Sequence, residues 1–205
     1  MTSAVALSIR STVSLPRKTD LTRSVPRATR GSLTLHEATP DDAHAIHGLI
    51  ARHLDEGRLL PRDLAEISIH AHRFVVAAND DGVVGCADLA PLSRTVAEVR
   101  SLVVSDRTRS TGVGSRLIDA LVARASRAGF DRLCAFTHAP AYFVQLGFSI
   151  VPHEWLPEKI SADCGTCALF RRCGQYAVML PLTRARHASA KATADKYVPL
   201  ASLHG

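Results

Sequence analysis

The sequence predicts an α/β (α+β) fold in which helices flank a mixed central sheet. Strand-like and helix-like segments alternate through the middle of the chain, a pattern typical of helices packed on a sheet. Apolar residues make up 46% of the 205 positions, which is ample for a buried core. In addition, a glycine-containing loop at residues 109–114 joins an apolar run to an amphipathic segment, as a strand-to-helix junction in such a fold requires.

The first half of the domain opens with a short predicted strand over residues 32–37. A helix follows because Thr39-Pro40-Asp41-Asp42 offers an N-cap, a proline at the first helical position and an acid three residues after the cap. Apolar residues then recur at helical spacing, at Ile46, Leu49, Ile50 and Leu54. A second helix is predicted over residues 62–71. Apolar runs at 74–78 and 82–90 predict two strands joined by a hairpin turn.

The second half begins with a predicted strand over residues 97–104, which leads into the glycine loop. A helix over residues 114–128 has one apolar face, formed by Leu117, Ile118, Leu121 and Val122. Gly129 ends this helix as a C-terminal cap. The remaining predicted elements are a strand at 133–136, a helix at 140–146, and strands at 148–151 and 176–182.

Charge divides the chain into a core and two basic tails. The net charge is +6, but residues 1–31 carry +5 and residues 184–205 carry +3, which leaves residues 32–183 at −2. We interpret both tails as disordered extensions of one domain, with an organelle transit peptide as the alternative for residues 1–31. A nucleic-acid groove needs its positive charge on the folded part, and no run of about 18 apolar residues occurs. We therefore expect a cytoplasmic protein with neither nucleic-acid nor membrane partners.

The glycine loop, Arg109-Ser110-Thr111-Gly112-Val113-Gly114, has the composition of an anion site. Its two glycines lack Cβ atoms, so successive backbone N–H groups can point into one concavity, and the helix N-terminus adds about half a positive charge. Pyrophosphate is the natural occupant, and a plain glycine turn is the alternative. The spacing is neither the Gly-x-Gly-x-x-Gly of dinucleotide folds nor that of a nucleoside triphosphate loop.

This loop resembles the acetyl-coenzyme A loop of the GCN5-related N-acetyltransferases (GNAT). Three further blocks are similar to the acetyltransferase domain of N-acetylglutamate synthases, in their short single-domain form. These blocks are Gly57-Arg58-Leu59-Leu60-Pro61-Arg62, the run Ala97-Glu98-Val99-Arg100-Ser101-Leu102-Val103-Val104, and Leu156-Pro157-Glu158-Lys159-Ile160 followed by Cys164-x-x-Cys167 and Cys173. The resemblance implies the GNAT fold and acetyl transfer from acetyl-CoA to the α-amino group of glutamate, the first step of arginine biosynthesis. Glutamine, another small amine or a protein lysine remains an alternative acceptor, and a non-catalytic acyl-CoA sensor is the alternative class.

For the cofactor, the resemblance implies that backbone of Leu102, Val103 and Val104 pairs with the pantetheine arm, and that the Val103 N–H faces the thioester oxygen. Backbone N–H groups from Ser110 to Ser115 are expected to cradle the pyrophosphate, with Arg109 or Arg116 at the rim and Phe143 closing the far wall. Ordinary solvated charge is the alternative for the two arginines.

For the reaction, Glu98 is the predicted general base, because it lies fourteen residues before Gly112, a spacing at which several relatives carry this base. Its alternative is a structural salt bridge with Arg100, and strand alternation places Glu98 on one face with Arg100 and Leu102. Tyr142 is the candidate general acid, one position away from the tyrosine of relatives, and a packed ring is its alternative.

For the acceptor, cationic side chains suit the carboxylates of an amino acid. Arg62, Arg100 and Lys159 fall in the matched blocks and are the predicted substrate residues, with surface charge as the alternative for each.

Five cysteines in a chain without a secretory signal are expected to be reduced thiols. Cys164, Cys167 and Cys173 have metal-like spacing, with His153 as the nearest fourth ligand, but a packed or redox-sensitive cluster is favoured over zinc. We therefore predict no metal. A homodimer is compatible with the sequence.

Overall fold

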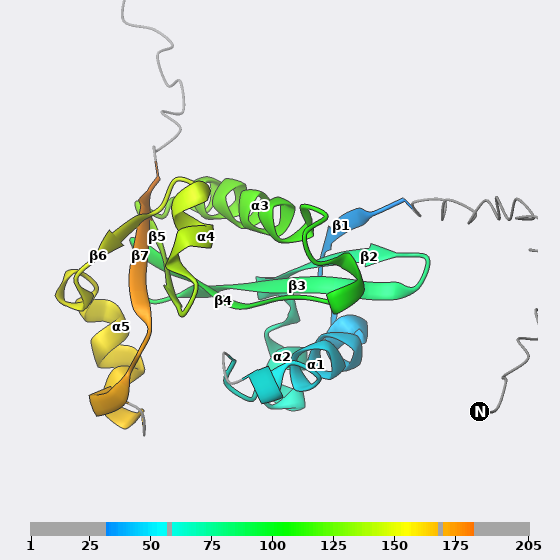
Figure 1. Cartoon of the computed structure of the whole chain (residues 1–205), viewed down its shortest axis with the longest axis horizontal. Helices are drawn as coiled ribbons and strands as arrows, with labels where there is room; N and C mark the ends of the chain where they lie inside the picture. The colour runs from blue at the N-terminus through cyan, green and yellow to red at the C-terminus, as the bar shows by residue number, and fades with distance from the viewer. Residues whose placement is uncertain (1–31, 57–58, 168–169, 183–205) are drawn as a thin grey trace, which may run out of the picture. The chain divides into compact units, whose positions relative to one another are not determined.

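The computed structural model describes residues 32–56, 59–167 and 170–182. Within these ranges, seven strands form one sheet in the order β1-β2-β3-β4-β5-β7-β6 (Figure 1). The strands are β1 (Thr34–Glu37), β2 (Phe74–Asn79), β3 (Gly82–Pro91), β4 (Val96–Val104), β5 (Arg132–Thr137), β6 (Ser149–Val151) and β7 (Tyr176–Pro181). The α-helices are α1 (Ala43–Ala51), α2 (Leu64–Ile69), α3 (Val113–Arg127), α4 (Pro140–Gln145) and α5 (Pro157–Ala162). Single turns of 3-10 helix lie at Pro40–Asp42, Leu54–Glu56, Ala71–Arg73, Asp106–Thr108, His153–Trp155, Cys164–Thr166 and Phe170–Arg172.

Helices cover both faces of the sheet (Figure 1). On one face, the apolar stripe of α3 packs on β2 to β5, and Phe143 of α4 joins the same cluster. On the other face, α1 and α2 pack on β2 and β3 around Phe74, while Leu156, just before α5, packs on Val96 and Cys134. The sheet is therefore the middle of three layers, and its second face is covered by two separate clusters.

The predicted helices and strands are present, with ends shifted by two residues or fewer except at the first helix, which opens with the 3-10 turn Pro40–Asp42 and ends at Ala51. The Asp42 carboxylate accepts the Thr39 N–H at 2.8 Å, as the capping pattern predicts. Helix α5 was not predicted from the sequence. This helix has six residues and none of them is buried, so it lacks the apolar periodicity by which a helix is recognised.

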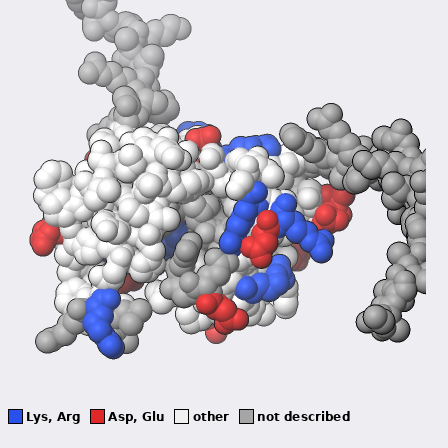
Figure 2. All heavy atoms as spheres, viewed as in Figure 1, with Lys and Arg blue, Asp and Glu red and all other residues white. Residues whose placement is uncertain are grey.

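Several sequence expectations lie outside the described residues: the two tails, 1–31 and 184–205, and positions 57 and 58 of the first matched block. No helix in the described ranges has both the length and the apolar character needed to cross a lipid bilayer. Figure 2 shows acidic and basic side chains intermixed on one part of the described surface, beside a broad area that carries few charges.

Strands β4 and β5 separate after a short contact. They pair in parallel from Val96 to Glu98, and the rest of β4 pairs only with β3 among the described strands. The splay exposes one backbone edge of β4 from Val99 onward, and it positions the site described below.

A β-bulge interrupts β4 just beyond this point. Cys86 lies opposite Val103 and Asp88 lies opposite Arg100, so β4 has one residue more than β3 in between, and Ser101 adopts a left-handed φ of 49°. The bulge reverses the alternation of side chains. Leu102 packs on the α3 face with Ala97 and Val99, so the expectation that it shares a face with Glu98 and Arg100 is wrong.

Candidate active site

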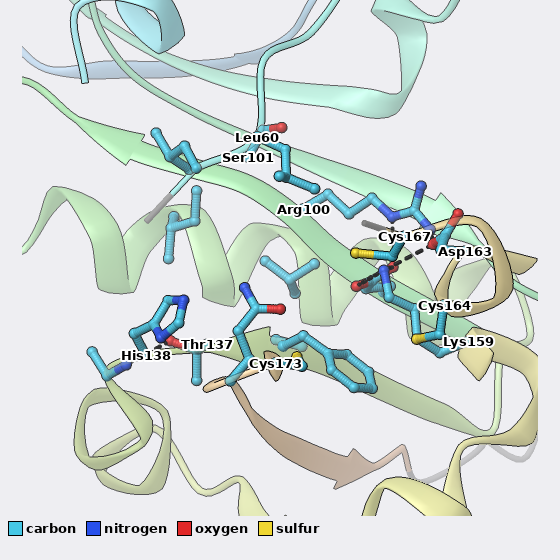
Figure 3. Close-up of a pocket in the computed structure, with 18 of the residues that line it drawn as sticks. Leu60, Arg100, Ser101, Thr137, His138, Lys159, Asp163, Cys164, Cys167 and Cys173 are labelled. Carbon is cyan, nitrogen blue, oxygen red and sulfur yellow. Dashed lines mark hydrogen bonds and ion pairs between the residues drawn. The ribbon is translucent and has the colours of Figure 1, made fainter. Parts of the chain in front are cut away.

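A cavity of about 1190 Å³ lies where β4 and β5 separate (Figure 3). It is lined by residues before α2, by β4, by the start of α4 and by α5 with the turns that follow it. The predicted residues that meet there are Arg62, Glu98, Arg100, Leu102, Val103, Val104, Arg109, Tyr142, Phe143 and Lys159. Segments distant in sequence thus assemble one site.

The glycine loop borders a second cavity of about 440 Å³. Gly112 is the N-cap of α3 with a left-handed φ of 86°, and Ser110 is also left-handed at 63°. No side chain caps α3 and no acid lies in its first turn, so the positive end of the helix dipole is not offset by a side chain there, and Gly112, Gly114 and Ser115 of this first turn line the cavity. We call residues 109–115 the anion loop. Its Arg109, Ser110, Gly112, Gly114 and Ser115 line the cavity together with Leu102, Val104, Thr108 and Tyr142.

The side chains of three predicted cofactor residues point away from both cavities, while the role predicted for the backbone N–H groups of Thr111 and Val113 stays a prediction. Val113 is buried in the core beneath α3, and the Thr111 hydroxyl donates to the Thr108 carbonyl at 2.6 Å. The Arg116 guanidinium donates to the Leu33 carbonyl at 3.4 Å, and it lines neither cavity. Of the two candidate arginines, Arg109 is the one that borders both cavities.

Tyr142 stands where the two cavities meet. Its hydroxyl lies over Gly114, so near that a Cβ at that position would come within 2.6 Å of it. The hydroxyl is buried and meets no hydrogen-bond partner among the described residues. Burial raises the pKa of Tyr142; Ser115 lies close enough to lower it in part without reaching hydrogen-bonding geometry. Phe143, the next residue, packs edge-on against Phe148 in the core and also borders the larger cavity.

Four charged side chains close a ring at one end of the larger cavity. Glu98 accepts from Arg100 Nε at 2.5 Å and from Lys159 Nζ at 2.7 and 2.9 Å. Asp163 accepts from Lys159 Nζ at 2.8 Å and from Arg100 Nη2. This ion-pair ring, Glu98–Arg100–Asp163–Lys159, ties β4 to α5 and has no net charge, and Figure 3 shows its two cations and Asp163 converging.

A second set of ion pairs holds Arg62 at the cavity wall. Its guanidinium donates to Glu66 at 2.7 and 3.2 Å, lies 3.5 Å from Asp88 and donates to the Ser101 hydroxyl at 3.3 Å. Asp88 is fully buried and also accepts two hydrogen bonds from Arg73, both at 3.1 Å. Burial raises the pKa of Asp88, and Arg73 and Arg62 partly offset that effect.

Sequence reasoning missed Asp163, Glu66 and Asp88. Asp88 did leave a signal, since it is a charged residue inside the apolar run from Gly82 to Pro91 and needs a buried partner there. The only sequence signal for Asp163 was its spacing of four residues from Lys159, at which opposite charges on a helix can pair.

The cysteines fall into two groups. Cys86 and Cys134 are buried in strands, and burial raises the pKa of each thiol to about 12. The backbone N–H of Val103 lies beside the Cys86 thiol and partly offsets that rise, so its role toward a thioester oxygen stays a prediction. Cys164, Cys167 and Cys173 border the larger cavity. In the described part of the chain, no three His, Cys, Asp or Glu side chains are placed to hold a metal ion, and His153 bonds the Gln175 carbonyl at 3.0 Å.

Comparison with known sequences agrees with this architecture. The family model described as "Acetyltransferase (GNAT) domain" matches residues 70–150. An uncharacterized N-acetyltransferase of Chlorobaculum tepidum is 30% identical over 141 residues, which cover 69% of this chain and 91% of that relative. An amino-acid acetyltransferase of Ralstonia nicotianae is 35% identical over 126 residues, 60% of this chain but 28% of the relative. The chain thus spans less than a third of that longer protein.

Solved structures share the fold. N-acetylglutamate synthase from Neisseria gonorrhoeae, complexed with coenzyme A and N-acetyl-glutamate, aligns with a TM-score of 0.67 at 24% identity over 75% of this chain and 36% of that one. Rv2747 from Mycobacterium tuberculosis, in complex with CoA and NLQ, aligns with a TM-score of 0.64 at 22% identity over 73% of this chain and 99% of that one. At these identities the likeness is one of fold.

Proposed function

This chain belongs to the GNAT acetyltransferase family, and we propose that it transfers an acetyl group from acetyl-CoA to the α-amino group of an amino acid, glutamate being the favoured acceptor. As a member of this family it is an acyltransferase that uses acetyl-CoA as cosubstrate. The product with glutamate is N-acetylglutamate, the first intermediate of arginine biosynthesis.

The residues around the anion loop fit this cosubstrate. Gly112 and Gly114 leave an open cradle at the uncapped end of α3, where a pyrophosphate would accept backbone N–H groups, with Arg109 at the rim. The free edge of β4 from Leu102 to Val104 suits the amides of the pantetheine arm. Tyr142 lines both cavities, and its buried hydroxyl, which has no partner in the described chain, lies over Gly114.

Acetyl-CoA supplies the acetyl group as a reactive thioester. In the proposed reaction Glu98 takes a proton from the acceptor ammonium through a water, so that the nitrogen lone pair can attack the acetyl carbon. A C–N bond forms, and the nitrogen of the tetrahedral intermediate still carries two protons. As the C–S bond breaks, the departing sulfur takes the Tyr142 proton, and one of the two nitrogen protons passes through water to the tyrosinate. The products are the amide, the thiol of coenzyme A and one proton held by Glu98. Arg62, Arg100 and Lys159 hold the acceptor's carboxylates.

The observation that supports an amino acid most directly is the convergence of Arg62, Arg100 and Lys159 on one cavity beside Glu98. Three cations exceed what a simple amine needs. Each of the three cations also has an acidic partner. When Arg73, which shares Asp88 with Arg62, is included, four cations are balanced by four acids: Glu66, Asp88, Glu98 and Asp163. This balance favours glutamine, whose side chain is neutral, as the second candidate acceptor.

The test is to incubate the purified protein with acetyl-CoA and a panel of free amino acids, and to follow thiol release while confirming the acetylated product by mass. Turnover confined to glutamate, or to glutamate and glutamine, is the expected result. Thiol release with other amines but with no amino acid would redirect the assignment within the family. If the protein bound coenzyme A but turned over no substrate, the result would support the alternative that it is a non-catalytic acyl-CoA sensor.

A further inference from the structure

Asp163 contacts two of the three predicted substrate cations, Lys159 and Arg100. A single oxygen, Oδ2, accepts from Lys159 Nζ at 2.8 Å and from Arg100 Nη2. Burial alone would raise the pKa of Asp163, but Lys159, Arg100 and Arg62 together hold it below its ordinary value. A carboxylate of this chain therefore sits at the place where a carboxylate of the acceptor is expected to bind.

The charges around this place leave no room for one more carboxylate. Arg100 and Lys159 each pair with two acids within the ion-pair ring, and Arg62 already pairs with Glu66 and Asp88. An acceptor carboxylate that entered beside the ring would put three acids around two cations, and like charges at this separation repel each other. One ring carboxylate must move when such an acceptor binds.

Of the two carboxylates in the ion-pair ring, Asp163 can be released from the cations at the lower free-energy cost. Both acids contact both cations, but the side chain of Asp163 is 38% exposed, whereas that of Glu98 is 3% exposed. Glu98 also lies in the middle of the sheet, while Asp163 follows directly after α5, a helix with no buried residue. Water can solvate a released Asp163, but a released Glu98 would stay buried without a partner.

We propose that Asp163 occupies the binding place of an acceptor carboxylate and that the acceptor binds by displacing Asp163 from Arg100 and Lys159. The proposal deepens the proposed function and rests on it for an acceptor that carries a carboxylate. It makes Asp163 a specificity-determining residue. A ligand that brings its own carboxylate replaces Asp163 on both cations, whereas an amine without one leaves Asp163 in place.

The experiment measures binding of glutarate, a dicarboxylate without an amine that cannot be acetylated. Isothermal titration calorimetry compares the wild-type chain with Asp163→Asn, which keeps the shape of the side chain and removes its charge. We expect the Kd for glutarate to fall about tenfold, which corresponds to about 1.4 kcal/mol. An equal or weaker affinity in Asp163→Asn would overturn the proposal.

Glu158→Gln is the matched control. Glu158 pairs with Arg132 of β5 at 3.0 Å, so this change also removes an ion pair between α5 and the sheet, but neither residue lines the cavity. Its Kd for glutarate should equal that of the wild type. A gain as large as that of Asp163→Asn would mean that loosening α5 is sufficient, and the proposal would fail.

A measurement on the unaltered chain covers the case in which Asp163→Asn does not fold. The Asp163 N–H donates to the Lys159 carbonyl at 3.0 Å at the end of α5. Glutarate binding should accelerate hydrogen exchange at this amide, because the side chain that anchors it is released. Slower exchange there would contradict displacement.

The two proposals can fail separately. If Asp163→Asn gains affinity for glutarate but no amino acid supports thiol release, the displacement stands and the amino-acid acetyltransferase assignment falls. If glutamate is acetylated but the affinity for glutarate and the KM for glutamate are the same in Asp163→Asn and wild type, the assignment stands and the displacement falls.

Discussion

At the scale of single residues, Glu98 shows how a charge can be kept inside the sheet. A carboxylate that is 2% exposed is costly unless it is paired, and Arg100 and Lys159 both donate to it. The pairing that was the structural alternative for Glu98 is therefore present in the structure. The role of Glu98 as general base stays a prediction, because taking a proton requires that at least one of these contacts be given up when the acceptor binds.

Glu98→Gln is expected to lower kcat about a hundredfold or more, because an amide cannot accept the ammonium proton. The affinity for coenzyme A should stay nearly unchanged, since the anion loop does not contact this side chain. Steady-state kinetics and calorimetric titration with coenzyme A measure the two effects. Activity within about threefold of wild type would remove Glu98 from proton transfer.

Tyr142→Phe tests the predicted general acid. Because burial raises the pKa of Tyr142 above 10.0, the proton-bearing form and its share of stability are fully present below pH 10.0 and are lost as pH rises through the raised value. We expect kcat to fall about tenfold to a hundredfold in the variant. No alkaline limb due to this group should appear in the wild type below pH 10.0.

Stability separates the acid role from packing. The hydroxyl is buried and has no hydrogen-bond partner in the described residues, so its removal should raise the free energy of unfolding or leave it unchanged. Unchanged kcat in Tyr142→Phe would assign the ring to packing alone.

At the scale of elements, α3 and α4 meet at one close contact, that of Gly114 with the Tyr142 hydroxyl. Gly114→Ala should lower the free energy of unfolding by about 1–3 kcal/mol, because the added methyl group overpacks this contact. In a Tyr142→Phe background the same change should be neutral or stabilising by up to about 1 kcal/mol, since alanine favours the helix. Urea unfolding of the four proteins measures the coupling, and equal effects in both backgrounds would refute it.

The elements that could be predicted are those with their own local signal. The first helix has a capping box, α3 has an apolar stripe, and Gly129 ends α3 with a left-handed φ of 85°. The bulge at Ser101 and the helix α5 could not be predicted. The bulge depends on pairing with β3, and α5 is held by ion pairs to β4 and β5 rather than by an apolar face.

In the candidate site, too, some residues could be predicted from the sequence and others could not. Matched blocks identified Arg62, Glu98, Arg100 and Lys159, and the fold brings them to one cavity. Their partners Asp88 and Asp163 were not predicted, because the sequence alone does not show which charged residues become neighbours across a sheet. The ion-pair ring joins residues more than sixty positions apart, such as Glu98 and Lys159.

At the scale of the whole molecule, the sheet consists of two parts joined by a short parallel contact between β4 and β5 at Val96 to Glu98. According to the proposed function, coenzyme A binds along the free edge of β4 and at the anion loop, and such binding should stabilise the native state. At a free concentration of a hundred times Kd, the expected gain in the free energy of unfolding is about 2.7 kcal/mol.

Urea unfolding with and without coenzyme A measures this gain. Gly112→Ala is the matched control, because a side chain at a φ of 86° strains the loop that would hold the pyrophosphate. Its gain at the same coenzyme A concentration should be smaller. An undiminished gain in Gly112→Ala would place the coenzyme elsewhere.

The order of these parts along the chain also bears on synthesis. Strand β4, the anion loop and α3 precede α5 and β7, and a nascent chain leaves the ribosome from its N-terminal end. These three segments are therefore made first, and the ion-pair ring cannot close until Asp163 has been translated. A chain stalled between α3 and α5 would carry its anion loop but neither Lys159 nor Asp163 of the ion-pair ring.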